Sequence, residues 1–157
     1  MASILWNVGE RSVVDGWLGG QSNYLTPNIV PSAGGNWGLG LGTRVGGVGS
    51  NKADLIATIA EIGTTTASGY ARQSITRNQA GGGWPAASKP GASYQSTAPQ
   101  VTFSFTNAPN PNGATLWFLA GTNVIGNDNA IFGADTAATR TFNNGDTERV
   151  TATYQQT

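Results

Sequence analysis

Large apolar residues alternate with glycine from residue 36 to residue 43, which reads Asn-Trp-Gly-Leu-Gly-Leu-Gly-Thr. Successive side chains of an extended chain point to opposite sides, so this period of two predicts a β-strand. Trp37, Leu39 and Leu41 form its apolar face, and the other face carries only glycines. A bare face lets another backbone approach closely, so we expect this strand to pack tightly against a neighbour.

Further strands are expected where alternation returns or where a short apolar run lies between turn signals. Residues 116–120 are apolar on both faces, which predicts a central strand. Residues 107–113 are rich in Asn and Pro and predict a turn, and Asn144-Gly145 is the strongest hairpin signal in the chain. The other predicted strands are 70–76, 101–106, 130–133 and 150–154.

Two segments are harder to interpret. The apolar residues of 53–62 follow a helical period, yet their β-branched side chains favour a strand, which we prefer. Residues 78–96 form the longest Gly- and Pro-rich segment and are predicted to be a loop, of the kind that often carries a contact. Trp84 within it is expected either to fill the core or to anchor an interface.

One helix is expected, at about residues 8–18. Its apolar residues recur at steps of three and four, Asn7 is a suitable N-cap, and Gly19-Gly20 ends the pattern. The apolar stripe would pack across the mouth or one edge of the sheets.

The length of 157 residues suits one domain, 1–157, with a single core. The 23 Gly and 7 Pro favour turns and short strands over long helices. Short strands with frequent turns predict a mostly β fold, specifically a single antiparallel β-sandwich of jelly-roll or immunoglobulin-like type with one short N-terminal helix.

Charged residues make up only 10% of the chain, against roughly 25% in an ordinary soluble domain. With eight basic and eight acidic residues the formal net charge is zero, so electrostatic self-repulsion is weak and close contact with other proteins is tolerated. The basic residues are scattered and form no stripe for a phosphate backbone, so nucleic acid is not an expected partner. The opening residues 1–8 resemble no signal peptide, and no apolar run is long enough to cross a bilayer, so we expect a soluble protein with no membrane partner.

Histidine and cysteine are both missing from the sequence, which removes the commonest general acid–base residue and the thiolate ligands of metals. The glycine spacings match neither a dinucleotide-binding nor a Walker motif, and Asn127, Asp128 and Asn129 lack the spacing of a known calcium loop. We therefore expect no catalytic residue, no cofactor and no metal. The acids weighed as a catalytic pair are Asp15, Asp54, Glu61, Asp128, Asp135, Asp146 and Glu148, of which Asp128 and Asp146 lie in turn sequences.

Exposed aromatic residues are the other possible functional feature, because they can stack on sugar rings. Trp6, Trp17, Trp37 and Trp117 lie in periodic segments and are expected in the core. Trp84 and Tyr94 remain, which are few for a carbohydrate-binding module but enough to anchor an interface. By residue type and position, the candidate protein-interface residues are Trp84, Tyr94, Arg72, Arg77 and Trp37.

Several short motifs occur in an order that resembles a family of small virion structural proteins of tailed bacteriophages, described as capsid cement, decoration or tail-fibre-like proteins. The motifs are Asn7-Val8-Gly9, the strand at 36–43, Gly69-Tyr70-Ala71-Arg72, Trp84-Pro85-Ala86-Ala87, Thr102-Phe103 and Asn144-Gly145-Asp146. Together they span most of the chain.

The resemblance implies a non-enzymatic β-sandwich that belongs to a phage particle. Within the family we favour a capsid cement protein, a homotrimer that binds the major capsid protein on the capsid surface after assembly in the host cytoplasm. The alternatives are a tail-fibre or baseplate component that binds host glycans or attaches a receptor-binding protein, and then a free-standing carbohydrate-binding module.

Overall fold

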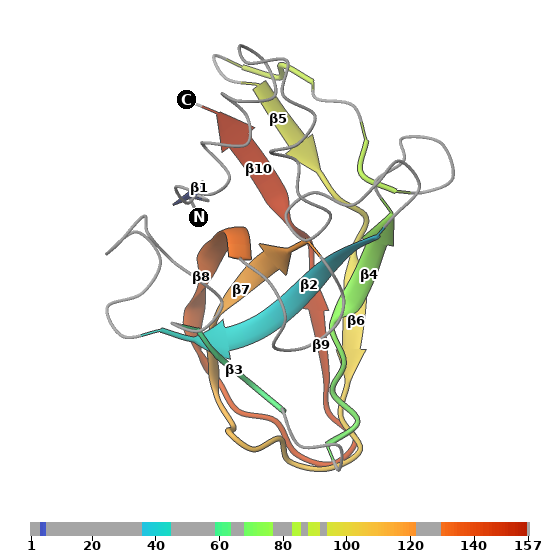
Figure 1. The fold of residues 1–157 in the computed structure, drawn as a ribbon, viewed down its shortest axis with the longest axis vertical. Coiled ribbons are helices and arrows are strands. Elements are labelled where there is room, and N and C mark those ends of the chain that lie inside the picture. The colour runs from blue at the N-terminus through green and yellow to red at the C-terminus, as the bar shows by residue number, and fades with distance from the viewer. Residues whose placement is uncertain are drawn as a thin grey trace.

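The structure is a computed structural model, and it describes residues 4–5, 36–44, 59–63, 68–76, 83–85, 88–91, 94–121 and 130–156. Every strand in these residues pairs antiparallel with its neighbours, which confirms the prediction of a mostly β protein with antiparallel sheets (Figure 1). The predicted helix at 8–18 lies outside the described residues.

The largest sheet has six strands in the order β1-β8-β7-β2-β3, with β4 also paired to β2. β7 pairs with one edge of β2, over Gly38 to Gly42. β4 pairs with Gly38 and Leu39 as well, and β3 with Gly42, so both must lie on the other edge of β2. The strands are β1 (Ile4–Leu5), β2 (Asn36–Thr43), β3 (Ala60–Glu61), β4 (Gln73–Thr76), β7 (Ala114–Ala120) and β8 (Ala130–Arg140).

Two of these strands, β2 and β7, are the ones that the sequence pattern predicts most clearly. The alternating Trp/Leu/Gly segment forms β2, and the segment that is apolar on both faces forms β7, which lies between β2 and β8. The predicted central strand is therefore confirmed. In the ambiguous segment 53–62, the described part is the two-residue strand β3 and its neighbours, which agrees with the preferred interpretation there.

Two further ladders follow each other along the long axis of the molecule (Figure 1). β5 (Tyr94–Thr97) pairs with β10 (Thr153–Gln156), and β6 (Val101–Ser104) pairs with β9 (Thr147–Val150). We call these two ladders together the ribbon, because the same two chain segments, 94–104 and 147–156, form both.

The ribbon is interrupted where residues 98–100 face residues 151–152. One side thus has an extra residue, which is the definition of a β-bulge. Pro99 lies in this bulge and has no N–H to give to a ladder. The Ala98 N–H donates to the Ala152 carbonyl across the gap at 2.8 Å, so the two ladders remain joined by a backbone bond.

The hydrophobic core is shared by the large sheet and the ribbon. Leu41 of β2 and Trp117 of β7 are direct cross-strand partners, and both belong to one buried cluster with Phe103 of β6 and Val150 of β9. Complete burial of such a side chain stabilises the fold by about 1.5–3 kcal/mol. Thr102 and Ser104 of β6 alternate with the buried residues and are exposed, as their period of two predicts.

The prediction of a hairpin at Asn144-Gly145 is wrong. Asn144-Gly145 forms a turn, with Gly145 at φ 84°, but it joins β8 to β9, which lie in different sheets, and so it is not a hairpin. A turn sequence fixes only local backbone geometry, whereas strand pairing depends on what each strand packs against.

Other predictions are wrong in their bounds. The single strand expected at 150–154 is two strands, β9 and β10, and the short strand expected at 130–133 extends as β8 to Arg140. The loop expected at 78–96 ends early, because Tyr94 begins β5 and Gln95 exchanges two backbone hydrogen bonds with Ser88. Polar strand residues such as Gln95 and Ser96 carry little apolar signal, so these ladders were not visible in the pattern.

Candidate functional site

The strands β3 and β4 follow each other along one edge of β2, and buried polar side chains lie where one ends and the other begins. β4 pairs with residues 36–39 of β2 and β3 pairs with residues 42–43, which leaves Gly40 and Leu41 between them. An unpaired backbone N–H or carbonyl inside a protein is costly, so this gap needs other partners. We call these two residues, Gly40 and Leu41, and the side chains beside them, those of Glu61, Tyr70 and Arg72, the junction.

Tyr70 takes the place of a strand partner in the junction. The Leu41 N–H donates to the Tyr70 hydroxyl at 3.0 Å, and that hydroxyl donates to Oε1 of Glu61 at 2.9 Å. The Leu41 carbonyl accepts from the Ile62 N–H at 3.1 Å. Both backbone groups of Leu41 are therefore satisfied, one by a side chain and one by the end of β3.

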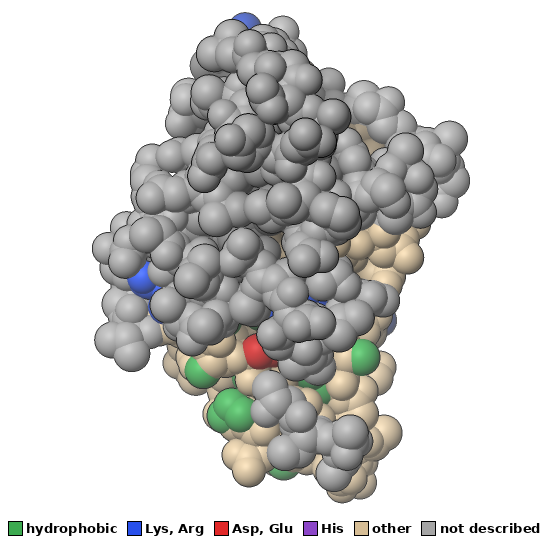
Figure 2. Space-filling model, viewed as in Figure 1, with side chains coloured by type: hydrophobic (Ala, Val, Ile, Leu, Met, Phe, Trp, Pro, Cys, Tyr) green, Lys and Arg blue, Asp and Glu red, His purple; other side chains and the backbone are tan. Residues whose placement is uncertain are grey.

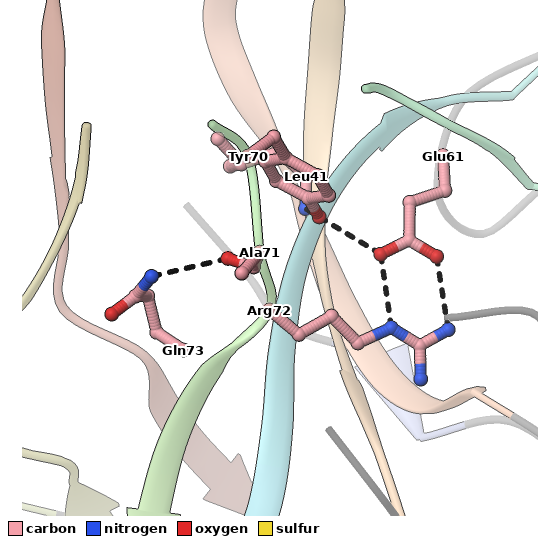
Figure 3. A network of polar contacts seen from close by, with 6 residues as sticks. All are labelled: Leu41, Glu61, Tyr70, Ala71, Arg72 and Gln73. Carbon is pink, nitrogen blue, oxygen red and sulfur yellow. Dashed lines mark hydrogen bonds and ion pairs between the residues drawn. The ribbon is translucent and has the colours of Figure 1, made fainter. Parts of the chain in front are cut away.

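Glu61 and Arg72 form a bidentate ion pair beside this hydroxyl (Figure 3). Nε of Arg72 lies 2.9 Å from Oε1 of Glu61, and Nη2 lies 2.9 Å from Oε2. Glu61 is 6% exposed and Arg72 is 4% exposed, so the pair is almost completely removed from water. The guanidinium carbon also lies 5.3 Å from the centre of the Phe118 ring, a cation–π distance.

Two glycines give these side chains room. Gly40 pairs directly with Phe118, and a Cβ on Gly40 would lie 2.3 Å from Cζ of that ring. Gly63 has φ 66°, and a Cβ there would lie 2.6 Å from Cβ of Tyr70. The glycine face of β2 was expected to admit another backbone. At Gly40 an aromatic ring of the same chain fills that space, and at Gly42 a Cβ would lie 2.9 Å from the Ala60 carbonyl oxygen of β3.

The electrostatics of the junction keep Tyr70 neutral. Burial raises the pKa of the Tyr70 hydroxyl well above its usual range, and the negative charge of Glu61 raises that pKa further. The hydroxyl can therefore donate to Glu61 and accept from Leu41 over the whole neutral range. Since the carboxylate and the guanidinium bind each other inside the protein, the chemistry available to this cluster is to hold β3 and the start of β4 against β2.

The candidate interface residues differ in their surroundings and do not form one described surface. Arg72 is buried in the junction, so it is not available as a surface contact without opening the ion pair. Trp37 and Trp84 are half-buried and pack against the core, and the Trp84 N–H donates to the Thr76 carbonyl at 2.9 Å. Tyr94 begins β5 opposite Gln156, and Arg77 lies outside the described residues.

The tryptophans expected in the core have different outcomes. Trp117 is 8% exposed and belongs to the core, as expected. Trp84, expected either to fill the core or to anchor an interface, is half-buried and packs against the core. Trp6 and Trp17 lie outside the described residues.

Three of the acids considered as a catalytic pair, Glu61, Asp146 and Glu148, each bind a different partner. Asp146 has the turn role expected of it, because its Oδ2 accepts from the Asn143 N–H at 2.7 Å. Glu148 forms an exposed ion pair with Arg140 at 2.8 Å, and Asp135 lies half-buried in β8. Asp15, Asp54 and Asp128 lie outside the described residues, together with Asn127 and Asn129.

Sequence reasoning missed the junction as a unit. Glu61 was considered only as an acid and Arg72 only as a contact, and their separation of 11 residues has no local meaning. Two signals were present: Glu61 interrupts an apolar run between Ile59 and Ile62, and Tyr70 and Arg72 are two residues apart, on one side of an extended chain. A charge inside an apolar run is a sign of a buried pair.

Comparison with protein-family models, curated proteins and solved structures gives no match to this chain. Within the described residues, Asp and Glu side chains gather in no group of three or more that would hold a metal ion. The same part of the chain contains no helix of the length and apolarity that crossing a membrane requires.

Proposed function

We propose that this protein is a structural protein of a tailed-phage virion, a capsid cement or decoration protein that binds the major capsid protein and copies of itself as a trimer. The observation that carries the proposal is the ordered set of short motifs from Asn7-Val8-Gly9 to Asn144-Gly145-Asp146. Among the described motifs, 36–43 is strand β2, and Tyr70 and Arg72 belong to the junction.

The sparse charge of the chain supports this role. Only 10% of residues are charged, and several of those in described positions are bound within the chain, as in the pairs Glu61–Arg72 and Arg140–Glu148. In the described part of the face in Figure 2, uncharged polar side chains and backbone predominate. Many copies fixed closely to one shell require weak self-repulsion, which sparse charge and a formal net charge of zero favour.

We propose that the domain is a single antiparallel β-sandwich of jelly-roll or immunoglobulin-like type. The support is that the ribbon and one face of the six-stranded sheet contribute to the same core, with Phe103 and Val150 from one and Leu41 and Trp117 from the other. Two antiparallel layers around a common core are the basis of that architecture.

We also propose that the protein is not an enzyme and uses no cofactor. The sequence contains no histidine, and the buried acid and base of the junction are bound to each other. Such a pair stabilises a fold or specifies its strand arrangement and leaves neither group free to transfer a proton.

Cryo-electron microscopy of the intact phage particle tests the proposal, with immunogold labelling of the protein as the independent measurement. We expect density for this chain arrayed regularly over the head, at three-fold or quasi-three-fold positions. Density confined to the tail would refute the cement role and support the tail-fibre or baseplate alternative, for which a glycan array is the next experiment.

One variant, Trp84→Ala, separates folding from assembly. Because Trp84 packs against the core, Trp84→Ala is expected to lower thermal stability while leaving the oligomer unchanged. If Trp84 is instead an interface anchor, the same change weakens assembly by about 2 kcal/mol or more at unchanged monomer stability. Analytical ultracentrifugation beside thermal unfolding distinguishes the two outcomes.

A further inference from the structure

The sequence contains two Asn-Gly pairs, Asn112-Gly113 and Asn144-Gly145, and the fold treats them differently. Glycine has no side chain to shield its backbone nitrogen, so that nitrogen can attack the side chain of a preceding asparagine. Both pairs lie between strands, both asparagines are exposed, and both glycines have positive φ, 115° and 84°. The sequence alone thus predicts equal chemical lability for the two asparagines.

Asn112 is held in place by the backbone of a neighbouring segment. Its Nδ2 donates to the Phe142 carbonyl at 2.9 Å, and its Oδ1 accepts from the Phe142 N–H at 3.0 Å. The side-chain amide therefore pairs with Phe142 as a strand residue would. An amide fixed by two hydrogen bonds cannot rotate toward the nitrogen of Gly113.

Asn144 has no such constraint. It is exposed, and its side chain forms no hydrogen bond with any other part of the chain that the structure describes. The remaining protection is on the attacking atom, because the Gly145 N–H donates to the Phe105 carbonyl at 2.8 Å. This bond lies beyond the end of the β6–β9 ladder, where local opening requires the least free energy.

We propose that Asn144 is a site of spontaneous deamidation and that Asn112 is protected from it. The Gly145 nitrogen bonds to the side-chain carbonyl carbon of Asn144, its proton passes through solvent to the amide nitrogen, and the carbon–nitrogen bond of that amide breaks to release ammonia. Water then opens the cyclic imide at either carbonyl, which gives aspartate or isoaspartate. No enzyme and no co-reactant other than water is required.

The modification has a structural consequence for the core. Aspartate adds a negative charge to a chain of formal net charge zero, close to Asp146. Isoaspartate in addition lengthens the backbone by one carbon in the turn that provides the Gly145–Phe105 and Phe105–Asp146 hydrogen bonds. Phe105 is 2% exposed and stacks on Phe142 at 4.2 Å, so the change reaches the aromatic core directly.

The test is a timed incubation of the full chain at mildly alkaline pH, followed by peptide mapping with mass spectrometry and isoaspartate detection. We expect the Asn144 peptide to gain the mass of deamidation while the Asn112 peptide stays unchanged. In denaturant both should react at similar rates, and faster than folded Asn144. Equal conversion of the two sites in the folded protein, or no conversion at Asn144 when the denatured sample has reacted, would overturn the proposal.

Two variants complete the test. Asn144→Gln keeps the amide but reacts much more slowly, so it should strongly reduce the conversion without loss of fold at this exposed position. Asn144→Asp carries the charge without the longer backbone, so aged wild-type protein should unfold at a lower temperature than Asn144→Asp. An equal melting temperature would refute the effect of isoaspartate on the core.

Discussion

Two interruptions of strand pairing among the described residues, one in the ribbon and one at the junction, are repaired by different means. In the ribbon, Pro99 removes one ladder bond and the Ala98–Ala152 backbone bond bridges the gap. At the junction, the Leu41 carbonyl is satisfied by a backbone N–H, but the Leu41 N–H depends on the side chain of Tyr70, which binds Glu61 and, through it, Arg72. A backbone repair needs no particular side chain, whereas a side-chain repair depends on each residue in it. The two sites should therefore differ greatly in their sensitivity to substitution.

The largest effect is expected from removing one partner of the buried ion pair. Arg72→Met leaves the Glu61 carboxylate buried without its counter-charge, which should lower the free energy of unfolding by about 3–5 kcal/mol. The double variant Glu61→Leu with Arg72→Met should recover much of this loss. The measurement is chemical denaturation followed by circular dichroism.

The exposed pair is the matched control for that experiment. Arg140 is 55% exposed at its side chain, so Arg140→Met should cost at most about 1 kcal/mol. Similar losses for Arg72→Met and Arg140→Met would show that the junction pair contributes no more than a surface contact.

The next effect concerns the glycine face at the junction. In Gly40→Ala the new methyl group overlaps the Phe118 ring, and we expect a loss of about 1–3 kcal/mol from overpacking. Gly91→Ala is the control, because Gly91 has open space around its Cβ position and should be nearly neutral. Differential scanning calorimetry of both variants measures the contrast, and an unchanged melting temperature for Gly40→Ala would mean that Phe118 moves aside.

A comparable effect with a distinct pH dependence is expected from Tyr70→Phe. The variant leaves the Leu41 N–H without its acceptor, which should cost about 1–3 kcal/mol at neutral pH. Unfolded tyrosine ionises near its ordinary pKa of 10.0, whereas in the folded chain the pKa is raised. The stabilisation is therefore complete below that pH and is lost as the pH rises above it.

Chemical denaturation of wild type and Tyr70→Phe across the alkaline pH range measures the stabilisation by the Tyr70 hydroxyl. The difference in stability between wild type and Tyr70→Phe should shrink as the pH rises above the ordinary pKa of tyrosine. A difference that stays constant would mean that Tyr70 ionises as easily in the folded chain as in the unfolded one.

The smallest effect is expected in the ribbon. Pro99→Ala should change the free energy of unfolding by less than about 1 kcal/mol, because the gap is bridged by backbone atoms of other residues and only the unfolded chain gains freedom. Hydrogen exchange at Ala98 measures whether the bridging bond persists. If Pro99→Ala lowers the free energy of unfolding as much as Arg72→Met does, backbone and side-chain repairs do not differ in sensitivity.

The same contrast explains what could be predicted from the sequence. The strands β2 and β7 were predictable because their faces are marked by apolar residues such as Leu39 and Leu119, and the interruption of the ribbon has a local cause in Pro99. The pairing of Glu61 with Arg72 was not predictable, since it depends on two strands meeting along a third. The course of β8 into β9 was missed for the same reason: Asn144-Gly145 specifies a turn and not the sheet that follows.

The ribbon also bears on how fast this protein reaches its native state. Thr97 and Thr153 share a hydrogen bond at 3.0 Å although they are 56 residues apart in the sequence. Closing such a long loop costs entropy before any contact compensates for it, and folds dominated by distant strand pairs form in about milliseconds to seconds. During that interval the unpaired strands remain open to neighbouring chains, so the yield of native protein should fall as its concentration during synthesis rises.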